Sequence, residues 1–234
     1  MSRSGPQATD SPGGMSGPHA PAPQATAGWP VTGVVLAGGL GRRMGSVDKG
    51  LQPLDGQPMV AHVLARLRPQ VDELLINANR NLDRYETLGY RVVPDAIGGF
   101  SGPLAGLHRG LLEARCPLVV TAPCDSPFLP ADLVARLRVP LDAGRAVLAV
   151  ARTAEQAHPV FVLCRRDLLA HLAAWLQSGG RKIDAWYASI AVAHVAFDDE
   201  AAAFDNINTR ADLDAAGTRR RDLSDPSFRM PPQR

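Results

Sequence analysis

The sequence predicts a single α/β domain of three layers, α/β/α, in which helices cover both faces of a mostly parallel sheet. From Val31 onward, short apolar runs alternate with longer segments of helical period, a pattern typical of parallel strands joined by crossover helices. The 234 residues, 45% of them hydrophobic and 21% charged, suffice for one large core. We find no internal repeat, so we expect one domain over residues 30–216.

The expected elements follow in order. A buried strand at 31–37 precedes a helix at 58–71, which has Val60, Val63, Leu64 and Leu67 at helical spacing. Next come strands at 73–79 and at 90–95 up to Pro94, a helix at 102–114, a strand at 117–125, a helix at 130–137 and a strand at 145–151. The alternation then loosens into a strand at 159–164, helices at 166–176 and 181–190, a strand at 191–197 and a last short helix after 204–209.

Two tails are expected to flank this domain. Residues 1–29 are rich in Pro, Gly, Ala and Ser, and residues 1–28 contain no Val, Ile, Leu or Phe, so we expect them to be disordered. Residues 217–234 carry five Arg against two Asp and are expected to be flexible. Because the whole chain has a net charge of only +2, the basic charge belongs to this second tail, and the body lacks the footprint of a nucleic-acid binder.

The composition also bears on the compartment. The start of the chain lacks the pattern of a signal peptide, and no stretch approaches the roughly 18 apolar residues of a membrane span. The three cysteines, Cys116, Cys124 and Cys164, show no C-x-x-C spacing, which argues against a disulfide framework and a zinc site. We therefore expect a soluble, cytoplasmic protein with no membrane partner.

The stretch VVLAGGLGRRMGSVDKG, at 34–50, indicates phosphate binding. It contains no G-x-x-x-x-G-K-[ST] string, and its glycines are spaced one residue too widely for the G-x-G-x-x-G dinucleotide fingerprint. The remaining interpretation is a loop around a nucleoside triphosphate, in which Gly38 and Gly39 let main-chain N–H groups approach and Arg42, Arg43 and Lys49 supply charge. The alternative is a plain tight turn with solvated arginines. Three cations within eight residues of a strand end favour phosphate binding over this alternative.

LAGGLGRRMGSVDKGL resembles the L-A-G-G-x-x-x-R-M-G-x-x-K signature of the MobA family of nucleotidyltransferases, the molybdenum cofactor guanylyltransferases. The resemblance continues through INANR, GPLAG, PCDSPF and DNINT to about residue 216, and the order and spacing of these motifs are specific. It implies a Rossmann-like nucleotidyltransferase fold, Mg²⁺, and transfer of GMP from GTP to molybdenum-molybdopterin with release of pyrophosphate. Molybdoenzymes or their chaperones would be further partners.

Asp125 is the residue we expect to bind Mg²⁺. It follows an apolar strand, its hard oxygen suits this ion, and the family has its magnesium-binding aspartate at the matching position. Its alternative role is to cap the next helix, although Ser126 or Asp132 could do so. Lys49 and Arg43 match family positions that bind the triphosphate, whereas Lys49 could instead form a surface pair with Asp48. The role of Arg42 is open.

The remaining site residues are implied by the same resemblance. Leu36, Ala37 and Gly38 match positions whose main chain contacts guanine; related cytidylyltransferases read L-A-A-G, so Gly38 favours a purine. Asn77 and Asp95, at the ends of the second and third strands, match nucleotide-binding positions, although each could simply satisfy a turn. Asn206 and Asn208 match a late Asn-x-Asn motif that could orient metal, phosphate or pterin.

Three further residues of interest lie apart from the glycine loop. His158 and the pair Arg181–Lys182 are where an anionic pterin phosphate should dock, unless they are ordinary surface charge. Cys124 has no histidine paired with it by motif, and we interpret it as a buried filler rather than a nucleophile. The alternative functions are a cytidylyltransferase or sugar-phosphate nucleotidyltransferase of the same fold, or a nucleotide-binding regulator without turnover.

Overall fold

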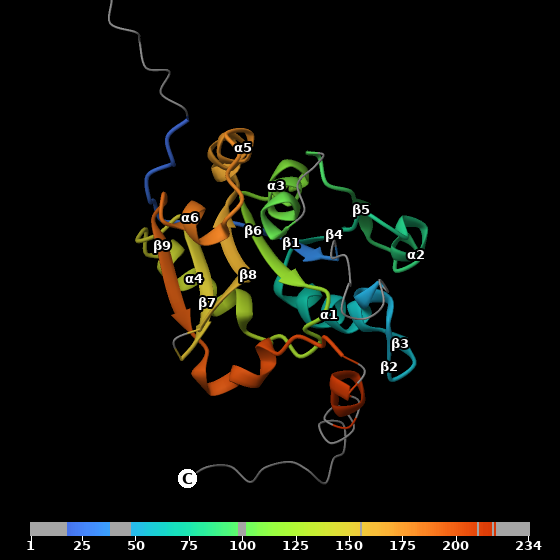
Figure 1. Cartoon of the computed structure of the whole chain (residues 1–234). Coiled ribbons are helices and arrows are strands. Elements are labelled where there is room, and N and C mark those ends of the chain that lie inside the picture. The colour runs from blue at the N-terminus through green and yellow to red at the C-terminus, as the bar shows by residue number, and fades with distance from the viewer. Residues whose placement is uncertain are drawn as a thin grey trace, which may run out of the picture.

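The computed structural model describes residues 18–37, 48–97, 102–154, 156–209, 211–216 and 218. These residues contain a seven-stranded sheet with the order β5-β4-β1-β6-β8-β7-β9 (Figure 1). The strands are β1 (Val31–Leu36), β4 (Glu73–Asn77), β5 (Arg91–Val93), β6 (Leu118–Pro123), β7 (Leu148–Thr153), β8 (Gln156–Arg165) and β9 (Val192–Ala196). Neighbouring strands are parallel, except that β8 runs antiparallel to both β6 and β7.

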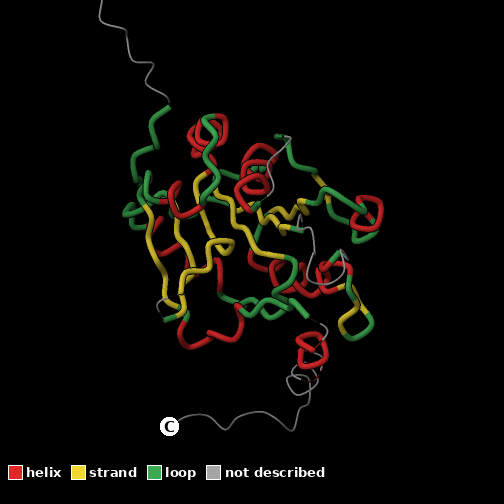
Figure 2. The backbone as a smooth tube through the Cα atoms, in the orientation of Figure 1, coloured by secondary structure: helices red, strands yellow, loops and turns green. Residues whose placement is uncertain are grey.

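Helices cover both faces of this sheet, so the predicted three-layer fold is confirmed (Figure 2). On one face lie α1 (Met59–Leu67) and α4 (Leu133–Asp142), and on the other lie α3 (Pro103–Glu113), α5 (Leu169–Gln177) and α6 (Ile183–Tyr187). The spacing of apolar residues explains the attachment of α1, since Val60, Val63, Leu64 and Leu67 are all buried against the sheet. None of the described helices is long and apolar enough to cross a bilayer.

Several short elements differ from the expectation. The segment at 49–57, for which no helix or strand was expected, forms a 3₁₀ turn η2 (Lys49–Leu51) and most of a hairpin of β2 (Pro53–Leu54) and β3 (Gln57–Pro58). Pro58, expected to start the helix, belongs to β3 instead. The helix α2 (Leu82–Glu86) and the 3₁₀ segment η5 (Asp198–Phe204) were also not expected. Two more 3₁₀ turns, η3 (Arg68–Gln70) and η4 (Arg166–Leu168), lie within the predicted helices at 58–71 and 166–176. The elements that were not expected are at most seven residues long, so they are too short to show the repeated apolar spacing that identifies longer elements.

The described part of the expected N-terminal tail, residues 18–29, lies against the domain instead of apart from it. Arg165 donates to the carbonyl oxygen of Ala22 at 2.6 Å, and Arg138 donates to that of Trp29 at 2.8 Å. Thr26 is fully buried. Hydrogen bonds from arginines therefore hold a segment that composition alone assigns to disorder. The contact lies at the amino ends of the strands, beside an open cavity of about 630 Å³ lined in part by Trp29 and Arg166.

Candidate functional site

Lys49 lies at the centre of a cluster built from three distant parts of the chain. Its Nζ atom donates to Asp125 Oδ2 at 3.3 Å and to Asn208 Oδ1 at 2.5 Å. Asp125 comes two residues after β6 ends at Pro123. The side chains of Lys49 and Asp125 are only 21% and 15% exposed. Three residues that the sequence singles out therefore meet at the carboxyl end of the central strands.

Burial makes Asp125 an unusual carboxylate. Desolvation raises its pKa, and the charge and hydrogen bond of Lys49 partly oppose that shift. A carboxylate in this setting gains from any further cation, because cations lower the cost of keeping it charged. The described residues contain no group of three or more His, Cys, Asp and Glu side chains that could enclose a metal. The hard oxygens present here, the carboxylate of Asp125 and the amide oxygen of Asn208 on the same lysine, are of the kind that suits Mg²⁺, which takes one or two carboxylates and completes its shell with phosphate and water.

The late Asn-x-Asn segment is joined directly to the segment that carries Asp125. Ser126 donates through Oγ to Asn206 Oδ1 at 2.7 Å, and the Ile207 amide donates to the Asp125 carbonyl oxygen at 2.9 Å. Ser126 is therefore used in this link. The alternative role of Asp125 as a helix cap receives no support, because α4 begins after Asp132, seven residues further on.

Asn77 and Asp95 form a second cluster. Asn77 is 2% exposed, and its Nδ2 donates to Asp95 Oδ1 at 3.0 Å and to the Val93 carbonyl oxygen at 3.1 Å. Helix α3 approaches closely, because a Cβ atom at Gly106 would lie 2.5 Å from Asn77 Oδ1. The final glycine of the GPLAG motif therefore lets this helix pack on the ends of the strands.

The end of β1 separates the two clusters. Leu36 pairs with Asn77 on one side and with Pro123 on the other, and the Ala37 amide donates to the Asn77 carbonyl oxygen at 2.8 Å. The glycine loop starts immediately after these residues, so it begins between the two clusters. Gly38, Gly39, Arg42 and Arg43 lie outside the described residues.

Asp48 is not the ion-pair partner that the sequence offered for Lys49. Its carboxylate instead accepts hydrogen bonds from Tyr85 Oη at 2.6 Å and from Asn81 Nδ2 at 2.9 Å. Neither Tyr85 nor Asn81 was singled out from the sequence. In the sequence, only a single tyrosine within a mostly polar stretch could have indicated these partners, and one such residue is weak evidence.

The surroundings of Cys124 disfavour the thiolate that a nucleophile needs. The residue is buried between the end of β6 and Asp125, and burial raises the pKa of its thiol well above the usual value. The negative charge of Asp125 acts in the same direction. These observations agree with its interpretation as a filler.

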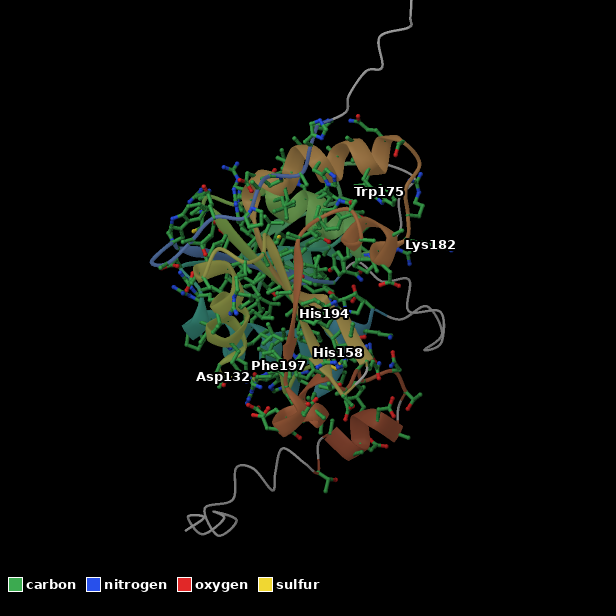
Figure 3. All side chains as sticks on the ribbon, turned by 90° about the vertical axis from the view of Figure 1, so that its left-hand side faces the viewer. Asp132, His158, Trp175, Lys182, His194 and Phe197 are labelled. Carbon is green, nitrogen blue, oxygen red and sulfur yellow. The ribbon has the colours of Figure 1, made fainter. Side chains whose placement is uncertain are left out.

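The pterin-side candidates are not brought together. His158 stacks on Phe204 with ring centroids 4.7 Å apart, and its Nε2 lies 2.7 Å from Thr153 Oγ1. Figure 3 shows Lys182 well apart from His158 along the molecule. One phosphate group therefore does not contact both, and a joint role for His158 and Arg181–Lys182 in docking it is not supported.

Partly buried histidines give the protein an expected pH dependence of stability. Burial is the main cause that lowers the pKa of His158, and likewise those of His108 and His171. The unfolded chain therefore takes up protons at a higher pH than the native state, and the free energy of unfolding should fall as the pH drops below about 6.5. Urea denaturation between pH 7.5 and 5.5 measures this slope.

The contribution of one histidine is isolated by comparing a variant with the wild-type protein. His158→Gln should flatten the slope, because the pKa of His158 is lowered by burial. Asp125 contributes with the opposite sign because its pKa is raised, and the difference between the variant and the wild type cancels its contribution. An unchanged slope in the variant would contradict the role of His158.

Comparison with known proteins places this chain in a family. A family model described as a MobA-like NTP transferase domain matches residues 33–192. The molybdenum cofactor guanylyltransferase of Cupriavidus taiwanensis is 54% identical over 190 residues, which cover 79% of this chain and 95% of that protein. The protein of the same name from Cupriavidus necator is 53% identical over 194 residues, covering 81% and 97%.

The likeness extends to solved structures. Molybdopterin-guanine dinucleotide biosynthesis protein A from Archaeoglobus fulgidus superposes with a TM-score of 0.68 at 23% identity, covering 81% of this chain and 98% of that one. At that level of identity, the superposition shows that the fold is shared. Taken with the match of the family model and the identity to the two Cupriavidus proteins over almost their whole length, it shows that the chain belongs to the MobA-like NTP transferase family.

Proposed function

We propose that this protein transfers GMP from GTP to the terminal phosphate of molybdenum-molybdopterin, forming the guanine dinucleotide form of the cofactor and releasing pyrophosphate. The contact of Lys49 with Asp125 and Asn208 next to the start of the glycine loop is the observation that carries the proposal. The names of the two Cupriavidus relatives, both molybdenum cofactor guanylyltransferases, support the choice of substrates.

The reaction is a displacement at phosphorus. An oxygen of the acceptor phosphate attacks the α-phosphorus of GTP, the bond to the bridging oxygen breaks, and its electron pair leaves with pyrophosphate. The acceptor is already an anion near neutral pH, so the step requires no general base. The ammonium of Lys49 would donate to phosphate oxygens and stabilise the charge that collects on the leaving group, and Arg43 is proposed to act with it.

Mg²⁺ is proposed as the cofactor, held by Asp125. When bound, the ion supplies positive charge against the phosphates. Lys49 bonds to Asp125 in the described structure, so the same carboxylate would orient both cations toward one group of oxygens. Asn206 and Asn208 would add neutral amide oxygens at this point without adding charge.

The second cluster is proposed to serve the nucleoside. Leu36, Ala37 and Gly38 would recognise guanine through their main-chain groups, and Asn77 with Asp95 would contact the nucleoside beside them. The register supports this division, because Asn77 and Pro123 flank opposite sides of Leu36. The base would then lie on the Asn77 side of β1 and the phosphates on the Asp125 side.

The reaction is proposed to take place in the cytoplasm. The free cysteines Cys116, Cys124 and Cys164 are all buried, which suits a reducing compartment. Molybdoenzymes or their chaperones would receive the product. Neither a nucleic acid nor a membrane is part of the proposal.

Nucleotide selectivity tests the proposal. Titration calorimetry should show that Mg-GTP binds at least about tenfold more tightly than Mg-CTP or Mg-ATP, because the wrong base leaves hydrogen-bonding groups unpaired. Pyrophosphate should appear only when molybdopterin is also present. A preference for CTP would reassign the protein to cytidylyl transfer. GTP binding without turnover in the presence of acceptor would favour a regulator, and no nucleotide binding would contradict both.

A further inference from the structure

Asp48 and Lys49 are adjacent in the sequence, but their side chains bond to different partners. Each carboxylate oxygen of Asp48 accepts one hydrogen bond, Oδ1 from Tyr85 and Oδ2 from Asn81. Its carbonyl oxygen accepts a further bond from the Leu51 amide at 3.3 Å. Lys49, by contrast, extends to Asp125 and Asn208. The residue before the lysine is therefore held by hydrogen bonds at three of its atoms.

Tyr85 supplies the shortest of these bonds from within the core. Its side chain is fully buried, on the short helix α2 that begins after Asn81. Burial raises the pKa of its hydroxyl far above the usual value, and the negative charge of Asp48 adds to the effect, so the hydroxyl remains a donor. A donor that is fixed by core packing holds its acceptor more firmly than one on a mobile surface side chain.

The residue after Lys49 is held by the same tyrosine. A Cβ atom at Gly50 would lie 2.6 Å from Tyr85 Oη and 3.2 Å from Cys124 Sγ. Only glycine therefore lets the main chain pass between Tyr85 and Cys124, the residue that precedes Asp125. Tyr85 touches the chain on both sides of Lys49.

We propose that Tyr85, acting through Asp48, is a positioning residue that fixes the main chain at Lys49 so that the ammonium reaches the triphosphate. The proposal rests on the proposed function of Lys49. A lysine side chain has four rotatable bonds, and ordering it costs entropy, so a fixed point of attachment increases the share of conformations that reach a phosphate.

Tyr85→Phe tests this by removing one hydroxyl and no other atom. We expect the affinity for Mg-GTP to fall severalfold, up to about tenfold, because Lys49 must then be ordered when the triphosphate binds, and the affinity for GMP to stay unchanged. The reason for the difference is that GMP lacks the two phosphates that Lys49 is proposed to contact. Calorimetry with both nucleotides measures the ratio.

Tyr187→Phe is the matched control. Tyr187 is also buried, on α6, and its hydroxyl donates to the Pro159 carbonyl oxygen at 2.8 Å. Both variants lose a hydrogen bond from a buried tyrosine hydroxyl, but only Tyr85→Phe should change the ratio of GTP to GMP affinity. In a Lys49→Ala background, Tyr85→Phe should have no further effect on GTP binding, because the two residues act as one unit.

A second readout needs no nucleotide. Lysine occurs only at positions 49 and 182, so labelling with an amine-reactive reagent and mass spectrometry can follow Lys49 with exposed Lys182 as the internal reference. Tyr85→Phe should raise the labelling rate of Lys49 relative to Lys182 severalfold, and Tyr187→Phe should not. Equal affinity ratios in the two variants, or an unchanged Lys49 rate, would overturn the proposal. A wild-type protein that binds no GTP would instead contradict the proposed function, while the labelling rate would still report whether Tyr85 fixes Lys49.

Discussion

Asp125→Asn is expected to lower kcat for guanylyl transfer by about a thousandfold, because an interaction worth several kcal/mol in the transition state is lost at about 1.4 kcal/mol per factor of ten. The asparagine keeps the size of the side chain but not the charge proposed to bind Mg²⁺. Pyrophosphate release at saturating GTP measures the change. The dependence of GTP binding on Mg²⁺ should weaken in the same variant.

Stability should not follow activity in this variant. Burial raises the pKa of Asp125, so the folded state disfavours its charge, and a neutral side chain of equal size removes that cost while keeping an oxygen that can accept from Lys49. The melting temperature should therefore change little. Asp132→Asn is the control, because Asp132 lies in the same connection and its side chain is 52% exposed. It should retain full activity. A comparable loss of activity in both variants would remove Asp125 from the proposed mechanism.

Lys49→Met is expected to have the next largest effect. The affinity for GTP should fall by about tenfold and kcat/KM by about a hundredfold or more, because the ammonium is proposed to bind the triphosphate and to stabilise the leaving group. The variant also leaves Asp125 largely buried without its cation, so the free energy of unfolding should drop by about 1–3 kcal/mol. Steady-state kinetics and urea denaturation measure the two effects.

The other lysine of the chain provides the comparison. Lys182→Met removes the same charge from an exposed site, and GTP affinity should not change. If both substitutions weaken GTP binding equally, the effect of Lys49 is one of overall charge. If neither does, Lys49 does not bind the triphosphate.

The sequence predicts the central strands well because each is a run of buried residues. β1 and β6 are buried over their first five residues, so their apolar patterns are unambiguous. The short helix α2 escaped prediction because only Tyr85 on it is buried. Composition assigns residues 18–29 to a tail. It carries no record of the hydrogen bonds that Arg138 and Arg165, over 100 residues away, donate to this segment.

The sequence predicts which residues form the candidate site better than it predicts which of them contact one another. The rule that ligands bind at the carboxyl ends of parallel strands, together with the motifs, identified Asp125, Asn208 and Lys49. Their mutual contacts depend on the register of strands and on the return of the chain to β6, which no local pattern specifies. The same limitation explains why Asp48 was offered as the partner of Lys49 when it in fact accepts hydrogen bonds from Tyr85 and Asn81.

The contact between Lys49 and Asn208 spans 159 residues, and this has a consequence for how the protein acquires its activity. During synthesis the sheet strands up to β9 leave the ribosome before Asn208 does, so a largely formed sheet precedes a complete site. The end of the chain must then return to the hairpin β2–β3, where Ile207 and Ala216 pack against Leu54. Closing so long a loop is slow relative to local folding. Nascent or truncated chains would thus be folded over most of their length while the lysine still lacked one of its two anchors, and nucleotide binding would mark the last stage of maturation.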